Sequence, residues 1–385
     1  MIHHGDCLDV MAGMDAASVD AIVTDPPYDL IEPRSLVGFG TSQRNGGRSE
    51  AEKAARRGGF MGKSWDGTGI AFRPRTWEEA FRVAKPGAYL LAFGGTRTYH
   101  RMTCAIEDAG WIIRDCLVWA YASGFPKSKA LLKPAWEPIV MARKPGPLRE
   151  LAIDACRIPH AGSGDLEESQ AKNPGRDGET VTSDVYGADR PQQLVNVVGR
   201  WPSNVVLTSP IFDGDTPGVV GGGIATTHPG KVRGGAVAIY GNDIERTPWD
   251  EGPGDSGTYS RFFLIPKADR AEREPVLGGL PLREYTTAEL RDFGAVDGNP
   301  RKPATGHISH RANHHPTVKP LDLMRHLVRL VTPTDGLVLD PFLGSGTTGL
   351  AAEMEGFRWV GIEREAEYVA IAEARLNGTQ KGLGI

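Results

Sequence analysis

The sequence has few cysteines, no long apolar run and no excess of positive charge. The four cysteines stand singly, with no Cys-x-x-Cys pair, which argues against a disulfide framework and a zinc knuckle and favours reduced thiols. Apolar runs such as residues 88–93 are too short to span a bilayer. The polar start at residues 1–6 is unlike a secretory signal. We therefore expect a soluble, cytoplasmic protein.

The formal net charge of −4 argues against a chain that coats nucleic acid non-specifically. Any surface for nucleic acid must therefore be local. The length of 385 residues is enough for one large α/β core together with an insertion or a second domain.

Strand and helix signals alternate through the first part of the chain and again near its end. An apolar run at residues 21–24 leads into a proline turn, helical periodicity covers residues 76–84, and a buried-type strand follows at residues 88–93. The same signals predict helices at 98–109, 321–331, 347–355 and 365–376, and strands at 116–120, 138–142, 337–340 and 359–363. This rhythm predicts a mostly parallel sheet with helices on both faces.

The periodicity fades over residues 148–313, where Gly, Pro, Asp and Asn recur every few residues. Short strands are expected there only at 204–208 and 261–265. A structureless connection of this length is uncommon in a compact protein, so we expect an inserted domain. The expected division of the chain is 1–147, 148–313 and 314–385.

A glycine-rich turn follows the expected strand at 337–340 and reads Asp340-Pro341-Phe342-Leu343-Gly344-Ser345-Gly346-Thr347-Thr348-Gly349. Its three glycines have the spacing of the dinucleotide-binding pattern, and Glu363 ends the next expected strand. Glycines let a ligand lie against backbone, and an acid at that place can hold two ribose hydroxyls. The turn therefore predicts a nucleotide-type cofactor, with a tight structural turn as the alternative.

An NAD-dependent dehydrogenase is a second interpretation of the same glycines. Such an enzyme usually opens with this unit and places its substrate domain after it. Here the unit closes the chain, and Asp340-Pro341-Phe342 precedes the first glycine. This departure from the dehydrogenase pattern favours a different cofactor, one with a positive sulfonium and an amino-acid tail. Asp340 and the start of the helix would be polar partners for it.

A second turn, Asp25-Pro26-Pro27-Tyr28, directly follows the first buried strand, at a place where open α/β sheets bind ligands. Consecutive prolines make the turn rigid and leave carbonyl acceptors. If Asp25 and the Pro26 carbonyl each accept one N–H of an exocyclic amino group, the nitrogen can pyramidalise and attack an electrophilic methyl group. Tyr28 would stack on a base flipped out of the duplex. The alternative is a turn made for geometry alone.

These two turns, in this order, resemble the β class of the amino-methyltransferase family, the DNA N6-adenine and N4-cytosine methyltransferases. Other segments are similar to members of phage or prophage type: Gly5-Asp6-Cys7, Gly62-Lys63-Ser64-Trp65-Asp66, Ser123-Gly124-Phe125-Pro126-Lys127-Ser128, Arg261-Phe262-Phe263 and His315-Pro316-Thr317-Val318-Lys319-Pro320. The resemblance covers nearly all of the chain except about 155–200 and 213–255.

The resemblance implies a doubly wound, mostly parallel, seven-stranded Rossmann-like sheet with an inserted irregular target-recognition region. The catalytic part of the core would be 1–147, the target-recognition region 148–313 and the S-adenosylmethionine-binding part 314–385. Catalysis would depend on Asp25, Pro26, Pro27 and Tyr28. The implied cofactor-binding residues are Asp6, Cys7, Thr317, Lys319, Asp340, Phe342, Gly344, Ser345, Gly346, Thr347, Thr348 and Glu363.

Within that set the resemblance implies separate roles. Asp6 and Cys7 would lie near the adenine of S-adenosylmethionine, and Glu363 would hold its ribose hydroxyls. Thr317 and Lys319 would help to fix the methionine end. A structural surface lysine is the alternative for Lys319.

The target atom is expected to be N6 of adenine. Family members with Asp at the position of Asp25 are mostly adenine enzymes, whereas Ser there is more typical of cytosine N4 enzymes, which stay the alternative. No cysteine follows a proline, which argues against cytosine C5 chemistry.

A DNA-binding module without activity is a rival from another class, and both intact turns argue against it. The expected partner is double-stranded DNA with no membrane; a homodimer stays open, and a restriction nuclease partner is undetermined.

Basic residues gather among glycines just after the proline turn, at Arg34, Arg44, Arg48, Lys53, Arg56, Arg57 and Lys63. They predict a loop that becomes ordered over DNA phosphates, with a merely solvated loop as the alternative.

Four histidines, His307, His310, His314 and His315, lie close together in sequence. No metal is expected there, because no cysteine is near and zinc needs fixed ligand geometry.

Replacement of Arg56 and Arg57 by alanine is expected to weaken DNA binding and to flatten its dependence on salt. The slope of log K against log salt concentration becomes shallower by about 0.9 for each phosphate that the protein no longer neutralises. Fluorescence anisotropy with a labelled duplex over a salt series measures it. An unchanged slope would contradict phosphate binding by these residues.

Overall fold

The computed structural model describes residues 1–29, 67–121, 132, 134–160, 163–172, 198–207, 218–220, 255–257, 283–285, 309–311, 313, 315 and 317–383. The chain divides into two compact units. The first comprises Met1–Cys156, Ser203–Ile211 and Leu264–Ile385, and the second Arg157–Pro202 and Phe212–Phe263.

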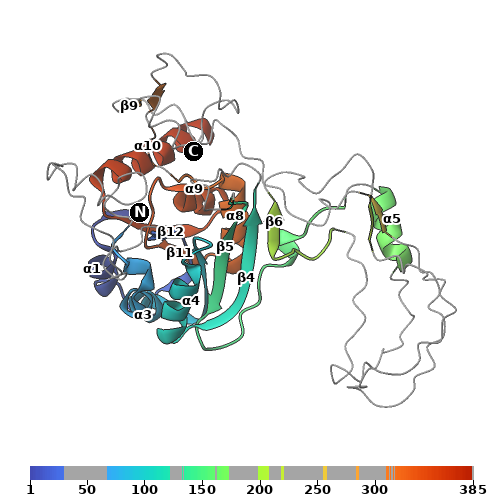
Figure 1. Ribbon diagram of the computed structural model, residues 1–385, viewed down its shortest axis with the longest axis horizontal. Helices are drawn as coiled ribbons and strands as arrows, with labels where there is room; N and C mark the ends of the chain where they lie inside the picture. The colour runs from blue at the N-terminus through green and yellow to red at the C-terminus, as the bar shows by residue number, and fades with distance from the viewer. Residues whose placement is uncertain are drawn as a thin grey trace, which may run out of the picture. The chain divides into compact units, whose positions relative to one another are not determined.

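A single large sheet organises the first unit (Figure 1). Its strands lie in the order β1-β12-β11-β2-β3-β5-β4-β6. The strands are β1 (Ile2–His4), β2 (Val19–Thr24), β3 (Ala84–Phe93), β4 (Ile112–Ala120), β5 (Trp136–Arg143), β6 (Val205–Leu207), β11 (Leu337–Asp340) and β12 (Arg358–Glu363). All neighbours pair in parallel except at β5, which runs against both β3 and β4. The predicted mostly parallel α/β sheet is confirmed. The sheet has eight strands rather than seven, because β6 adds to the β4 edge.

Helices cover both faces of this sheet, as a doubly wound fold requires. One core contains residues of α1, α3 and α4, and the other contains residues of α8 and α9. The sides alternate along β2, where Ile22 belongs to the first core and Ala21 and Val23 to the second. The helices of the first unit are α1 (Cys7–Ala12), α3 (Pro74–Val83), α4 (Tyr99–Asp108), α8 (Leu321–Val331), α9 (Thr347–Met354) and α10 (Ala366–Leu383), with short 3₁₀ turns at Ile70–Phe72 and Asp154–Cys156.

Local sequence signals explain several element ends. Pro74 begins α3, where its missing N–H costs nothing. In α8, Asp322 lies in the first turn and Arg329 in the last, so both charges complement the helix dipole. Strand β3 is buried along almost its whole length, which is why it has a continuous apolar run rather than alternation. No described helix is long and apolar enough to cross a membrane.

The second unit has little described secondary structure. Helix α5 (Ser163–Lys172) and an antiparallel pair, β7 (Gly218–Val220) with β8 (Asp255–Gly257), belong to it. Arg200 pairs with Ile158 in an isolated bridge and binds the Asp165 carboxylate. A further antiparallel pair, β9 (Arg283–Tyr285) with β10 (Ser309–Arg311), is part of the first unit. The strand expected at 261–265 lies outside the described residues.

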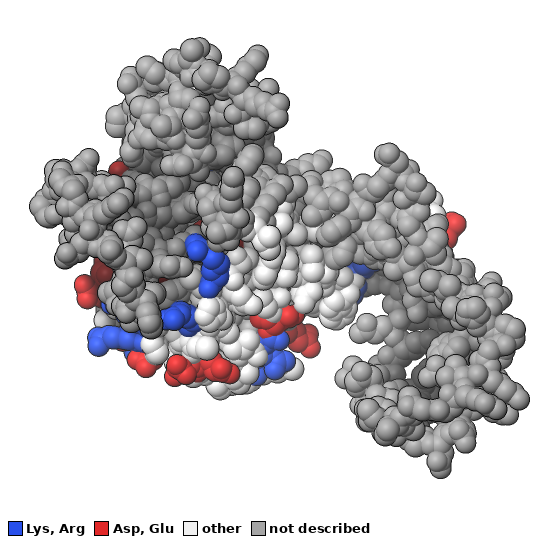
Figure 2. Space-filling model, in the orientation of Figure 1, with Lys and Arg blue, Asp and Glu red and all other residues white. Residues whose placement is uncertain are grey.

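The described surface carries charges of both signs. On the face drawn in Figure 2, Lys and Arg side chains are interspersed with Asp and Glu among the described residues. The net charge of −4 is therefore not a sign of one uniformly acidic face in this part of the molecule.

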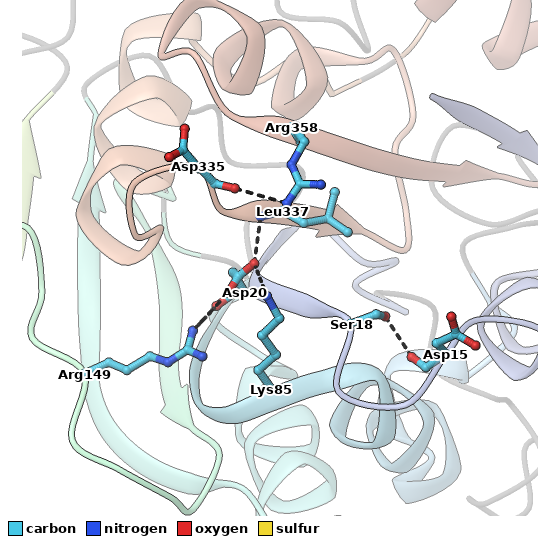
Figure 3. Close-up of polar contacts among 8 residues, drawn as sticks. All are labelled: Asp15, Ser18, Asp20, Lys85, Arg149, Asp335, Leu337 and Arg358. Atoms are coloured by element: carbon cyan, nitrogen blue, oxygen red, sulfur yellow. Dashed lines mark hydrogen bonds and ion pairs between the residues drawn. The ribbon is translucent and has the colours of Figure 1, made fainter.

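A buried carboxylate joins three strands at the amino edge of the sheet (Figure 3). Asp20 Oδ2 accepts hydrogen bonds from Lys85 Nζ at 2.7 Å and from the Leu337 N–H at 3.0 Å, while Arg149 Nη1 lies 3.3 Å from Oδ1. Burial acts to raise the pKa of Asp20, but these donors outweigh it and hold the pKa below its usual value. Asp20 therefore ties β2 to β3 and β11.

Asp20→Asn is expected to lower the free energy of unfolding by about 1–3 kcal/mol at pH 7, because it leaves buried donors with a weaker partner. A carboxylate with a depressed pKa stabilises the fold above its unfolded pKa, so the difference from wild type should narrow below about pH 4. Denaturant unfolding at several pH values measures this. The control is Asp15→Asn, a change at an exposed carboxylate in the same region; an equal effect of both variants would contradict the assignment.

Candidate active site

Four neighbouring parallel strands, β1, β12, β11 and β2, end at the same edge of the sheet. The residues singled out in the sequence follow these strand ends. Asp6 and Cys7 come after β1, Glu363 ends β12, the glycine turn (residues 340–349) begins at the end of β11, and the proline turn (residues 25–28) follows β2. The carboxyl edge therefore gathers residues from both ends of the chain.

The end of β2, directly before the proline turn, is joined to the glycine turn through the side chain of Asp340. Thr24 Oγ1 donates to Asp340 Oδ1 at 2.6 Å, the Phe342 N–H donates to the same oxygen at 3.0 Å, and Thr348 Oγ1 donates to Oδ2 at 2.6 Å. Burial raises the pKa of Asp340 to about 6, although the hydroxyl and backbone donors act to lower it. Because both oxygens accept bonds from the protein, this geometry supports a joining role for Asp340, and direct cofactor contact stays a prediction.

The glycines of this turn are needed for both space and backbone conformation. Gly344 has φ +54°, and a Cβ there would lie 2.7 Å from His315 Nε2. Gly346 has φ +86°, and a Cβ there would lie 3.0 Å from Ala372 Cβ. A side chain at either position would be strained by the positive φ and would have to displace His315 or press tightly on Ala372. His315 and Ala372 thus pack directly against the backbone of the turn.

A buried arginine of α10 supports the glycine turn from behind. Arg375 Nη1 donates to the Ser345 carbonyl at 2.6 Å and lies 3.0 Å from both Ser345 Oγ and Thr347 Oγ1. Two residues predicted to bind the cofactor therefore have their hydroxyls in contact with a helix of the protein. No sequence signal pointed to Arg375, because it lies 30 residues beyond Ser345 on a separate helix.

Glu363 lies beside the glycine turn with its carboxylate facing backbone donors. Oε2 accepts from the Gly344 N–H at 2.8 Å and Oε1 from the Glu365 N–H at 2.7 Å. Burial raises the pKa of Glu363 to about 7, and the two backbone donors act against it. A carboxylate has about four lone-pair positions, so acceptor capacity remains for hydroxyl groups.

Asp6 and Cys7 begin α1 next to Glu363. The Gly5 N–H donates to the Glu363 carbonyl at 3.0 Å, and Asp6 Oδ1 caps the helix by accepting from the Leu8 N–H at 2.9 Å. Cys7 is buried, and burial raises the pKa of its thiol to about 12. A thiol in this state is a packing group rather than a nucleophile.

The proline turn is held by three residues from distant parts of the chain. Lys319 Nζ lies 2.7 Å from Asp25 Oδ2 and 3.2 Å from the Tyr28 hydroxyl. The Tyr28 hydroxyl donates to Glu137 Oε2 at 2.9 Å, and Lys319 Nζ lies 3.3 Å from the same oxygen. Thr98 Oγ1 donates to the Tyr28 carbonyl at 2.8 Å. Glu137 and Thr98 were not singled out by the sequence.

Lys319 is buried, with 7% of its side chain exposed, so the alternative of a surface lysine is wrong. Its ammonium lies against the catalytic turn rather than in solvent. Burial acts to lower the pKa of Lys319, but the carboxylates of Asp25 and Glu137 outweigh it and keep the pKa above its usual value. Lys319 is therefore a charged group inside the site.

The second oxygen of Asp25 has no such partner. Asp25 Oδ1 is buried and has no hydrogen-bond partner among the described residues. Leaving a buried polar atom unpaired costs about 1–3 kcal/mol, and such atoms often serve function. Asp25 therefore presents one engaged and one open acceptor.

Thr317 and His315 lie on the segment that leads to Lys319. The Thr317 N–H lies 3.4 Å from His315 Nδ1, and the His315 ring packs on Tyr368 at a centroid distance of 4.5 Å. This histidine covers Gly344. Among the described residues no group of three or more His, Cys, Asp or Glu could hold a metal ion.

Some predicted residues cannot be placed. The seven basic residues expected to contact DNA lie outside the described residues, and so do His307, His314 and the similar segments 62–66, 123–128 and 261–263. Their roles stay predictions.

Comparison with known proteins shows the family to which the chain is similar. A family model described as DNA methylase (N6_N4_Mtase) matches residues 19–374. The chain is 39% identical over 108 residues to the type II methyltransferase M2.LlaDCHI of Lactococcus lactis subsp. cremoris, which is 26% of this chain and 39% of that protein. It is 46% identical over 65 residues to M2.DpnII of Streptococcus pneumoniae, which is 17% of this chain and 24% of that protein.

The matched segments therefore span well under two thirds of these curated relatives. Among solved structures, the cytosine-N4-specific PvuII DNA methyltransferase is similar with a TM-score of 0.44 and 15% identity, over 97% of this chain and 85% of that one. The family model includes both the proline turn and the glycine turn and most of the chain between them. The chain is a member of the DNA methylase family.

Proposed function

We propose that the chain transfers the methyl group of S-adenosylmethionine to an exocyclic amino nitrogen of a base in double-stranded DNA. The observation that carries this proposal is the joining of two turns by the Thr24–Asp340 hydrogen bond. It places an open acceptor, Asp25 Oδ1, beside a glycine turn with nucleotide-type spacing. Membership of the DNA methylase family supports the same chemistry.

The carboxyl edge has the features that S-adenosylmethionine requires. Glu363 would hold its ribose hydroxyls, Asp6 and Cys7 would lie near its adenine, and Phe342 and Gly344 would bound the pocket. The glycines of this turn leave backbone without side chains, which suits a ligand that lies against backbone. When bound, this cofactor supplies a methyl carbon that is made electrophilic by the neighbouring positive sulfur.

The protein's part in the reaction is to make the amino nitrogen nucleophilic. Its lone pair is delocalised into the ring of the base, so the group must pyramidalise before it reacts. Asp25 Oδ1 and the Pro26 carbonyl each accept one N–H, which withdraws the nitrogen from the ring plane. Tyr28 holds the flipped base. The proton that the nitrogen must lose is then already hydrogen-bonded to an acceptor.

N6 of adenine is the proposed target, and N4 of cytosine is the alternative within the same family. The presence of Asp rather than Ser at position 25 favours adenine. Target recognition is assigned to residues 148–313, which include the second unit, and DNA phosphate contacts are assigned to the basic segment after the proline turn. The cytoplasm is the proposed location, because the matched relatives come from bacteria, whose DNA lies there.

A single assay tests the reaction and its target. Mixed-sequence duplex DNA is incubated with the protein and methyl-labelled S-adenosylmethionine, digested to nucleosides and analysed by mass spectrometry. The proposal expects labelled N6-methyldeoxyadenosine. Labelled N4-methyldeoxycytidine would establish the alternative target, and the absence of any labelled base would contradict the proposed function.

Asp25→Ala is expected to lower the single-turnover methylation rate by at least about 10²–10⁴-fold, the usual range for removal of an acid–base group. Cofactor affinity should change little, because Asp25 has no assigned contact with the cofactor. Rapid-quench kinetics and calorimetry measure the two quantities. Asp25→Asn serves as the isosteric companion variant, since it keeps the volume and one carbonyl acceptor. Near-normal methylation by Asp25→Ala would overturn the mechanism.

Cofactor affinity is expected to rise as the pH increases through about 7, the pKa to which burial raises Glu363. Below that pH the carboxyl is protonated and has less acceptor capacity for ribose hydroxyls. Calorimetric titrations from pH 6.5 to 8.5 measure this, and Asp340, whose pKa is about 6, titrates mostly below that range. In Glu363→Gln the affinity should be lower at high pH, and the rise near pH 7 that depends on Glu363 should be lost, so that only the titration of the cofactor's own amino group is left. The same pH dependence in both proteins would assign it to another group.

A further inference from the structure

A buried cluster of charges lies behind the proline turn. Lys319 Nζ is within 3.3 Å of Asp25 Oδ2, the Tyr28 hydroxyl and Glu137 Oε2. The three partners come from β5 and from the turn after β2, and the lysine itself comes from the segment before α8. The cluster thus joins three separate parts of the chain at one point.

Three aromatic rings lie close to the same ammonium. Its distances to ring centroids are 4.9 Å for Phe93, 5.4 Å for Tyr28 and 6.0 Å for Trp119. Contacts of this kind attract a cation and exclude water from it. Lys319 therefore has little freedom to leave its position.

The cluster divides the two oxygens of Asp25 between two tasks. Oδ2 is engaged by Lys319, and this ion pair fixes the rotation of the carboxylate. Oδ1 remains buried and without a partner among the described residues. An isolated aspartate could turn either oxygen outward, whereas this one presents a single, defined acceptor.

Glu137 completes the arrangement in two ways. It accepts the hydroxyl hydrogen of Tyr28, which orients the ring that would hold the base. Its carboxylate is also the second one that the single ammonium of Lys319 contacts, besides that of Asp25. The cluster therefore controls both the acceptor and the ring of the proline turn.

The lysine segment also touches the glycine turn. His315, four residues before Lys319, lies close enough to fill the space of a Gly344 Cβ. One segment therefore contacts the turn of the amino group and the turn of the cofactor. The position of this segment therefore affects the distance between the proline turn and the glycine turn.

We infer that Lys319 and Glu137 are positioning residues for methyl transfer, which act by presenting Asp25 Oδ1 and the Tyr28 ring to the target base. This inference rests on the proposed function. It gives Lys319 a different task from the methionine-end contact that the family resemblance implied. The competing interpretation is a cluster that only stabilises the fold.

The test compares Lys319→Met, Glu137→Gln and the double variant with wild type. Positioning predicts a single-turnover rate about 100-fold lower for Lys319→Met, the order expected for a misplacement near 1 Å, and a smaller loss for Glu137→Gln. Dissociation constants for S-adenosylmethionine and duplex DNA should stay within about threefold of wild type, because the missing interaction acts on the reacting geometry. The double variant should be no slower than Lys319→Met, because both residues act through one unit.

Lys144→Met is the matched control. Lys144 Nζ also has two close acceptors, the Phe81 and Ala84 carbonyls at 2.6 and 2.8 Å, and lies 4.4 Å from the centre of the Phe81 ring. It follows the end of β5 at the opposite edge of the sheet. Its replacement should lower thermal stability and leave the rate of the folded protein within about twofold of wild type.

The outcomes separate the inference from the proposed function. Wild-type protein that transfers no methyl group to DNA would overturn both. Active wild-type protein, with Lys319→Met as fast as wild type or with cofactor affinity reduced in proportion to rate, would overturn the inference alone. If Lys319→Met does not fold, Glu137→Gln decides: a slower rate with unchanged dissociation constants supports positioning, and a wild-type rate overturns it.

Discussion

The parallel pairing of β2 with β11 is the constraint on which the rest of the site depends. Val338 lies opposite Ala21 and Leu339 opposite Ile22, and beyond this register the side chains of Thr24 and Asp340 meet at 2.6 Å. Two strands more than three hundred residues apart in sequence thus end side by side. Because both run in the same direction, both following turns lie at one edge. A shift of the register by one residue would reverse the faces of β2 and separate the two turns.

The antiparallel strand β5 adds a residue that no parallel strand could provide in the same way. In a parallel strand, the residues at the carboxyl edge are those that come after the end of the strand. Strand β5 runs against them, so its beginning lies there, and Glu137 is its second residue. Its other end leads to Lys144 at the amino edge. This reversal explains how a carboxylate at the start of a strand reaches the hydroxyl of Tyr28.

Charge is handled differently at the two edges of the sheet. At the amino edge Asp20 has two cationic partners, Lys85 and Arg149, and a backbone donor, so its carboxylate is fully engaged and its role is to join strands. At the carboxyl edge Lys319 is shared by two carboxylates, and one oxygen of Asp25 stays open. An excess of donors makes a structural joint, whereas an excess of acceptors leaves capacity for the amino group of a substrate.

Local patterns in the sequence determined the long elements and both turns. Helix α8 and strand β11 have the expected bounds, because their periodicity and flanking turns leave one solution, and the glycines at 344 and 346 adopt the positive φ that their residue type allows. Strand β1 and helix α1 were not predicted, because three and six residues give little periodic signal and neither is an apolar run. Tertiary structure alone decided the partners of the turns. Lys319, Glu137 and Arg375 reach them from distant positions, and no local signal encodes a contact between residues that only the packing of the sheet brings together.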